Sequence, residues 1–226
     1  MSRPALIDLV NAALVSIGQE PVPSLENNEE VSPVVTAVRA KVFITKRKLL
    51  RSNDWNCARI TAKLVPVQEK DKRGWEHIYL MPENPECLRV VQISIDGGET
   101  FIDLDEYYNR NAGPKESLFD IDNGKLLCNA EDVYIKYIGD IDAARFDASL
   151  ASAFVAQLAA DLAYTLPASV SLADYMQRLA KNELKSAKAL NAIERNILNP
   201  EGEVIGIRYG NAERHLRVDM SEEVES

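Results

Sequence analysis

The chain has 226 residues, of which 46% are hydrophobic and 27% are charged, and this balance is typical of an ordinary soluble globular protein. Its 35 acidic and 26 basic residues give a formal net charge of −9. That charge argues against a protein whose whole surface binds nucleic acid or an anionic lipid surface, because both carry many negative charges.

Cysteine usage and hydropathy indicate the compartment. The chain has three cysteines, far apart in sequence: Cys57, Cys87 and Cys128. An odd number cannot all enter disulfides within one chain, which favours a reducing, cytosolic origin. Asp8 interrupts the apolar start, which is not the pattern of a signal peptide. The most apolar run, 150–166, is short for a bilayer and contains Asp161. We therefore expect a soluble intracellular protein.

Two helices are predicted at the start of the chain. The first has Ser2 as its N-cap and ends at Gly18. Its apolar positions follow helical spacing: Leu6, Val10, Ala13, Leu14 and Ile17. After a loop rich in proline and glutamate, Ser32 and Pro33 form an N-cap and N1 pair for the second helix. This helix has apolar residues in steps of three and four and is expected to end at 52–54.

From residue 60 to about 138 the hydrophobic period changes towards two, which predicts strands. The expected strands are Ile60–Val67, Trp75–Met81, Leu88–Ile95, Thr100–Leu104, Ser117–Ile121, Lys125–Cys128 and Val133–Tyr137. Turn signals such as Gly97-Gly98 and Asn123-Gly124 separate them, so neighbouring strands can pair antiparallel. We predict a meander or a small sandwich, interrupted by a looser stretch at 105–115.

Two further helices follow the strands. The first, 147–166, is apolar on nearly every side and rich in alanine, so it must be covered all round. Pro167 ends this helix, and Ser169 or Ser171 caps a longer one that runs to about Ile197.

The order helices, strands, helices predicts an α+β fold, in which the terminal helices pack as a helical bundle with an inserted antiparallel β lobe. The predicted divisions are N-terminal helices 1–58, inserted β domain 59–140, C-terminal helices 141–198 and an extended tail 199–226. Within the tail, 204–209 resembles a strand, and we predict that the acidic end 219–226 is disordered.

The sequence nominates no catalytic, cofactor or metal-binding residues. Glycine-rich phosphate motifs and paired Cys or His spacings for zinc are missing. The only histidines are His77 and His215, and neither lies in a pattern typical of nucleophilic catalysis. Asp120, Asp122 and Glu131 follow part of a calcium-loop spacing, but an Asn123-Gly124 hairpin explains them better. We expect a protein that is not an enzyme.

The strongest charge anomaly is a run of six basic residues with no acid between Val31 and Asn53. Its members are Arg39, Lys41, Lys46, Arg47, Lys48 and Arg51. At 100° per residue most of them lie opposite the valine stripe of the second helix. A solvated helix face, an interface with an acidic partner and contact with DNA all fit this pattern. The DNA alternative makes the chain a small DNA-binding regulator that uses the basic helix 34–51.

Several segments, in order, resemble a known family. They are LVNAALVSIGQEPVPSLE, LLRSNDWNCARIT, Tyr79–Pro82, Cys87–Val90, Tyr137–Asp140, Phe146-Asp147 and the helix around 158–163. Their order and spacing resemble the tail tubular protein A family, the head–tail adaptors or gatekeepers of short-tailed phages. The resemblance extends from about Leu6 to Glu194, is weakest between Glu99 and Leu127, and rests on packing residues.

The resemblance implies a virion structural protein of the tail or neck, present in the host cytoplasm before assembly. In this family a ring of about twelve identical subunits joins the portal protein to the tail nozzle protein around a channel for double-stranded DNA. The helical part would face the portal and neighbouring subunits, and the β part the nozzle or tail fibres. The six basic residues are then the candidate portal or subunit interface. The resemblance implies no cofactor and no membrane contact.

Overall fold

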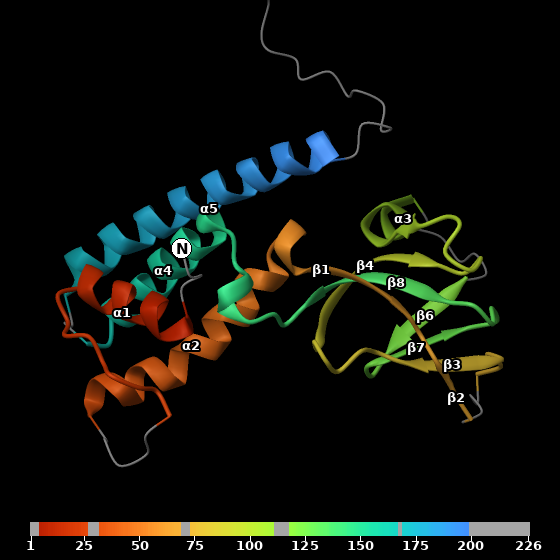
Figure 1. Cartoon of the computed structure of the whole chain (residues 1–226), viewed down its shortest axis with the longest axis horizontal. Coiled ribbons are helices and arrows are strands. Elements are labelled where there is room, and N and C mark those ends of the chain that lie inside the picture. The colour runs from red at the N-terminus through yellow and green to blue at the C-terminus, as the bar shows by residue number, and fades with distance from the viewer. Residues whose placement is uncertain (1–4, 27–31, 69–72, 111–117, 167–168, 199–226) are drawn as a thin grey trace, which may run out of the picture.

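The computed structural model describes residues 5–26, 32–68, 73–110, 118–166 and 169–198. Four long helices form one end of the molecule: α1 (Leu6–Ser16), α2 (Pro33–Arg51), α4 (Ala148–Ala163) and α5 (Val170–Leu198). The strands form the other end, which we call the β lobe (Figure 1). This combination of helices with antiparallel sheets confirms the predicted α+β class.

Side-chain caps set the starts of the helices. The Ser32 hydroxyl accepts a hydrogen bond from the Val35 N–H at 3.1 Å, and the Asp147 carboxylate accepts one from Leu150 at 2.8 Å. The predicted N-cap of the first helix, Ser2, is wrong. Helix α1 begins after Ala5, whose N–H donates to Asp8 at 2.8 Å. Ser2 itself lies outside the described residues.

The ends of the helices agree with their turn residues. Gly18, just past α1, has φ of +73°, the left-handed geometry that glycine adopts without a Cβ clash. Ser169, rather than Ser171, caps α5, because its hydroxyl accepts from the Leu172 N–H at 3.4 Å. Pro167 and the predicted elements 204–209 and 219–226 lie outside the described residues.

The β lobe contains two four-stranded antiparallel sheets. Their strands are β1 (Arg59–Lys63), β2 (Pro66–Val67), β3 (His77–Leu80), β4 (Cys87–Ser94), β5 (Ile102–Asp103), β6 (Phe119–Asp122), β7 (Lys125–Cys128) and β8 (Tyr134–Gly139). One sheet has the order β1-β8-β4-β5 and the other β2-β3-β7-β6. Of the two predicted arrangements, the sandwich is therefore the correct one, since β1 pairs with β8 and β3 with β7 across long stretches of sequence.

Three local predictions for the β lobe differ from the structure. The expected strand 60–67 is divided into β1 and β2, which belong to different sheets; Leu64, between them, still donates its N–H to Val133 O beside β8. The expected strand 100–104 is reduced to the two residues of β5. The looser stretch at 105–115 begins as a short helix, α3 (Leu104–Arg110), and residues 111–117 are outside the described part.

Two hydrophobic cores share the first sheet. Between the sheets, Ile93 and Ile135 of one pack with Tyr79 and Phe119 of the other. On its outer face, the first sheet adds Leu88, Val91 and Ile138 to the core of the helical part. Because successive residues of a strand point to opposite faces, β4 and β8 supply both cores. Helix α4 lies at the centre of the helical part and packs against α1, α2 and α5 (Figure 1).

Candidate functional site

Three of the six basic residues connect α2 to the β lobe. The Lys46 ammonium lies 2.7 Å from an Asp140 carboxylate oxygen and donates to the Ile141 carbonyl at 3.2 Å. Arg47 pairs with Glu86, on the turn before β4. The Arg51 guanidinium donates to the Leu88 carbonyl at 2.7 Å. These side chains therefore stabilise the junction between the two parts of this chain.

A fourth basic residue supports the loop after α1. The Arg39 Nε donates to the carbonyl of Leu25 at 2.8 Å. Asn11 of α1 also holds this loop. Its side chain accepts a hydrogen bond from the Val22 N–H at 2.9 Å and donates one to the Val22 carbonyl at 3.0 Å. Arg39 is thus one of the groups that position the loop beside α2.

The remaining two basic residues face solvent. Lys41 and Lys48 are exposed, and in the described part of the chain their side chains make neither an ion pair nor a side-chain hydrogen bond. Between them lie Phe43, 58% exposed, and Ile44, 67% exposed. We call Lys41, Ile44 and Lys48 the α2 ridge: two cations beside a large apolar side chain. Phe43 lies on another side of α2, in a hollow with Leu25 and Arg39.

An apolar groove of about 410 Å³ opens between α1, α4 and α5. Its lining is mostly small or aliphatic: Leu9, Ala12, Ser16, Ala151, Ser152, Val155, Ala156, Ala159, Met176, Leu179 and Glu183. We call it the α1/α4/α5 groove. Glu183 is its one charged lining residue among those described. The sequence pointed to this surface only through the alanines on every side of the predicted helix 147–166, and it gave no signal for Glu183.

A second polar junction holds the end of α5 to the segment between α2 and β1. Asp54 pairs with both Arg59 and Arg195. The buried Asn191 donates to the Asp54 carbonyl at 2.8 Å and accepts from the Asn56 N–H at 2.8 Å. Burial raises the pKa of Asp54, and the charge of Arg195 opposes that rise. This junction fixes α5 to the start of the β lobe.

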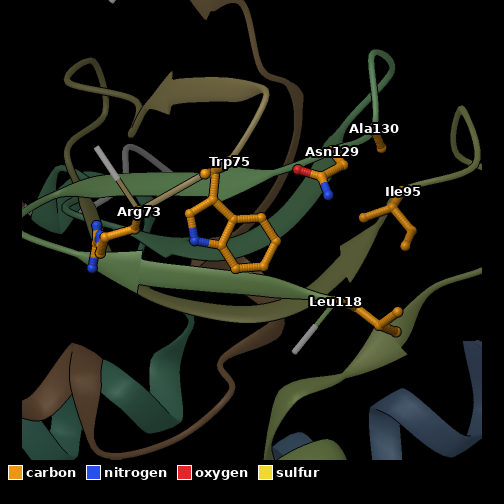
Figure 2. A pocket seen from close by; sticks show the side chains of 7 residues that line it. Arg73, Trp75, Ile95, Leu118, Asn129 and Ala130 are labelled. Atoms are coloured by element: carbon orange, nitrogen blue, oxygen red, sulfur yellow. The ribbon is translucent and has the colours of Figure 1, made fainter. Parts of the chain in front are cut away.

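The β lobe carries an open hollow of about 790 Å³ around the indole of Trp75 (Figure 2). Ile95, Leu118 and Ala130 also line it, with Arg73 and Asn129 as polar groups. Arg73 pairs with Asp120 at 3.0 Å, and the Asn129 side chain accepts from the Glu76 N–H at 3.1 Å. The hollow therefore combines a partly exposed aromatic surface with polar groups that already bond within the chain.

Among the described residues, no group of three or more His, Cys, Asp or Glu side chains is placed to hold a metal ion. Within the same residues, no helix is long and apolar enough to cross a membrane. In the described residues the arrangement consists of surfaces and junctions, and its exposed surfaces are the candidate site.

Comparisons with known proteins add no assignment: no family model matches the chain, and no curated protein matches it significantly.

Proposed function

We propose that the chain is a non-enzymatic structural protein of a phage virion, a head–tail adaptor. Its copies would form a ring of about twelve subunits that joins the portal to the tail nozzle around double-stranded DNA. The observation that carries this proposal is the ordered series of segments, from Leu6 to Glu194, that resembles the tail tubular protein A family.

The positions of the resembling residues support the proposal. Trp55, which follows α2, is fully buried, and its Nε1 donates to Leu49 O at 3.0 Å. Tyr79 is also fully buried, and its hydroxyl donates to the Ala130 carbonyl at 2.5 Å. Ile138 lies in the core shared by the helices and the first sheet. Because these residues determine packing, their shared order favours a shared fold.

The charge distribution is compatible with a channel protein. A net charge of −9 per subunit repels the DNA backbone, so a ring of such subunits would let the duplex pass without holding it. Under this proposal the helical part faces the portal and the neighbouring subunits, and the β lobe faces the nozzle or tail fibres. The hollow around Trp75 is then a surface that a tail-side partner could fill.

The DNA-binding regulator that uses helix 34–51 receives less support. Such a regulator needs free cations along one face to contact phosphates. Lys46, Arg47 and Arg51 contact the β lobe instead, and Arg39 contacts the loop after α1. The helix therefore retains few cations for a duplex.

Native mass spectrometry of the chain, alone and mixed with a portal protein from the same genome, tests the proposal. We expect the portal to take up a fixed multiple of the chain, near twelve copies. A portal that stays bare would contradict the proposal. Salt-dependent binding of duplex DNA by the monomer would then favour the regulator.

A further inference from the structure

The α2 ridge and the α1/α4/α5 groove lie on different sides of the central helix. Ala159 of α4 lines the groove, whereas the carboxylate of Asp161 accepts a hydrogen bond from Thr45 of α2 at 2.7 Å. Because Ala159 and Asp161 are two residues apart on a helix, their side chains project from α4 in directions about 160° apart. Figure 1 shows the same arrangement, with α2 and α5 on opposite sides of the helical part. One copy can therefore use both surfaces at once, each with a different neighbour.

The groove is an incompletely covered apolar surface. Most of α4 is buried, but Ser152 is exposed and Val155 is half-buried where the groove opens. Small side chains along it let another side chain approach the helix backbones closely. The carboxylate of Glu183, at the α5 side, has no ion pair or side-chain hydrogen bond within the described ranges. An occupant that brings apolar atoms and a cation would satisfy both parts of this surface.

The α2 ridge has that chemistry. Lys41, Ile44 and Lys48 follow one line of the helix at spacings of three and four, which place side chains on the same face. Ile44, at the middle of this line, is 67% exposed. The ridge therefore presents an apolar centre between two cations that have no partner among the described residues.

We infer that the α1/α4/α5 groove of one copy receives the α2 ridge of a second copy, with Ile44 against the groove and Lys41 or Lys48 beside Glu183. This deepens the proposed function, on which it rests, because it assigns the contact between neighbouring subunits of the ring. Two different surfaces meet, so the contact is head-to-tail and can close into a ring.

Charge identifies a second copy as the occupant. Copies with a net charge of −9 repel one another overall, so a contact between them is favoured at places where opposite charges meet. The ridge is a local positive surface on this acidic chain, and the groove provides the Glu183 carboxylate, which is unpaired within the described part of the chain. Complementary charges of this kind also fix the register of two partners.

A zero-length carbodiimide, which joins lysine amines to carboxylates in contact, tests the inference on the unmodified chain. A mixture of unlabelled and ¹⁵N-labelled chains is treated at high concentration, and the joined peptides are identified by mass spectrometry. We expect peptides that join Lys41 or Lys48 of one chain to Glu183 of another. Intermolecular products that lack Glu183, or none at all, would overturn the inference.

Charge reversal provides an independent measurement by sedimentation equilibrium. Lys48→Glu or Glu183→Lys should each weaken self-association about tenfold, because like charges then meet. The double variant, and an equimolar mixture of the two single variants, should regain the original association. Glu194→Lys, at an exposed position of α5 outside the groove, is the matched control and should have no such effect. If the single charge reversals weaken self-association but neither the double variant nor the mixture restores it, the inference is contradicted.

The two proposals can fail separately. If the chain docks on the portal in a fixed multiple but the Lys48 and Glu183 variants dock unchanged, the subunit contact assigned above is wrong and the adaptor proposal stands. If the cross-link to Glu183 forms but the portal takes up no chain, the contact stands and the adaptor proposal is wrong.

Discussion

The ammonium of Lys46 lies 2.7 Å from the carboxylate of Asp140, at the point where α2 meets the end of β8. Both side chains are largely buried, with 12% and 20% of their surfaces exposed. The same ammonium donates to the carbonyl of Ile141, which is 95 residues further along the chain. The two contacts join a helix near the start of the chain to the segment at the end of β8. They therefore stabilise the relative position of the helical part and the β lobe.

Lys46→Ala should lower the free energy of unfolding by about 1–3 kcal/mol, because it leaves a partly buried carboxylate without its main partner. Urea unfolding followed by circular dichroism measures the change. Lys48→Ala, on the same helix but exposed and with no side-chain partner among the residues that the structure describes, should change stability by less than about 0.5 kcal/mol. Equal effects of the two substitutions would argue against a structural role for the Lys46–Asp140 pair.

Asn191→Ala should destabilise the chain by about 2 kcal/mol, since Asn191 is 4% exposed and the N–H of Asn56 would lose its acceptor. Differential scanning calorimetry gives the shift in melting temperature. Asn182→Ala, an exposed position on the same helix, is the control. If both variants have the same melting temperature, the polar junction at the end of α5 contributes little to stability.

Stability should decrease in alkaline solution. Burial raises the pKa of Cys57 and that of Cys87 from 9.0 to about 11. Between these values the unfolded chain releases thiol protons that the folded chain retains, so folding is disfavoured as pH rises from about 9 to 11. Melting temperatures measured across this range should therefore fall, and the fall should be smaller in Cys57→Ala. A melting temperature that is independent of pH up to 11 would contradict the raised pKa values.

The two tryptophans should differ in fluorescence. Trp55 is fully buried, whereas Trp75 is partly exposed beside the hollow of the β lobe. Trp75→Phe should shift the emission to shorter wavelength and reduce quenching by acrylamide severalfold. Trp55→Phe should leave an emission that acrylamide still quenches. Addition of a tail-side partner that fills the hollow should protect Trp75, which gives a direct assay for that surface.

Local signals predicted the helices well. Ser32-Pro33 and Asp147 sit at the predicted starts of α2 and α4, because caps and first-turn residues act within a few positions. The short α3 was missed, since seven residues beside strand-like runs provide no clear helical period. The pairing of β1 with β8 could not be derived from turn signals, which report only on neighbouring strands.

The candidate interface was predictable only in part. The cationic run was visible in the sequence, but the partners of its members were not. Arg47 binds Glu86, 39 residues away, and Arg51 binds the backbone at Leu88, 37 residues away. Such contacts depend on how the β lobe docks against α2. Only the tertiary structure separates these junction residues from Lys41 and Lys48, which remain on the surface.

The first sheet, which contributes residues to both hydrophobic cores, also determines how the molecule unfolds. Arg59 and Ile138 are register partners, so the two ends of the β lobe lie side by side, and a short linker could in principle replace the lobe. A chain shortened in this way would lose Leu88, Val91 and Ile138 from the core of the helices. The lobe is thus an insertion in sequence without being a separable module. We expect the whole molecule to melt in one cooperative transition, with calorimetric and van't Hoff enthalpies that agree.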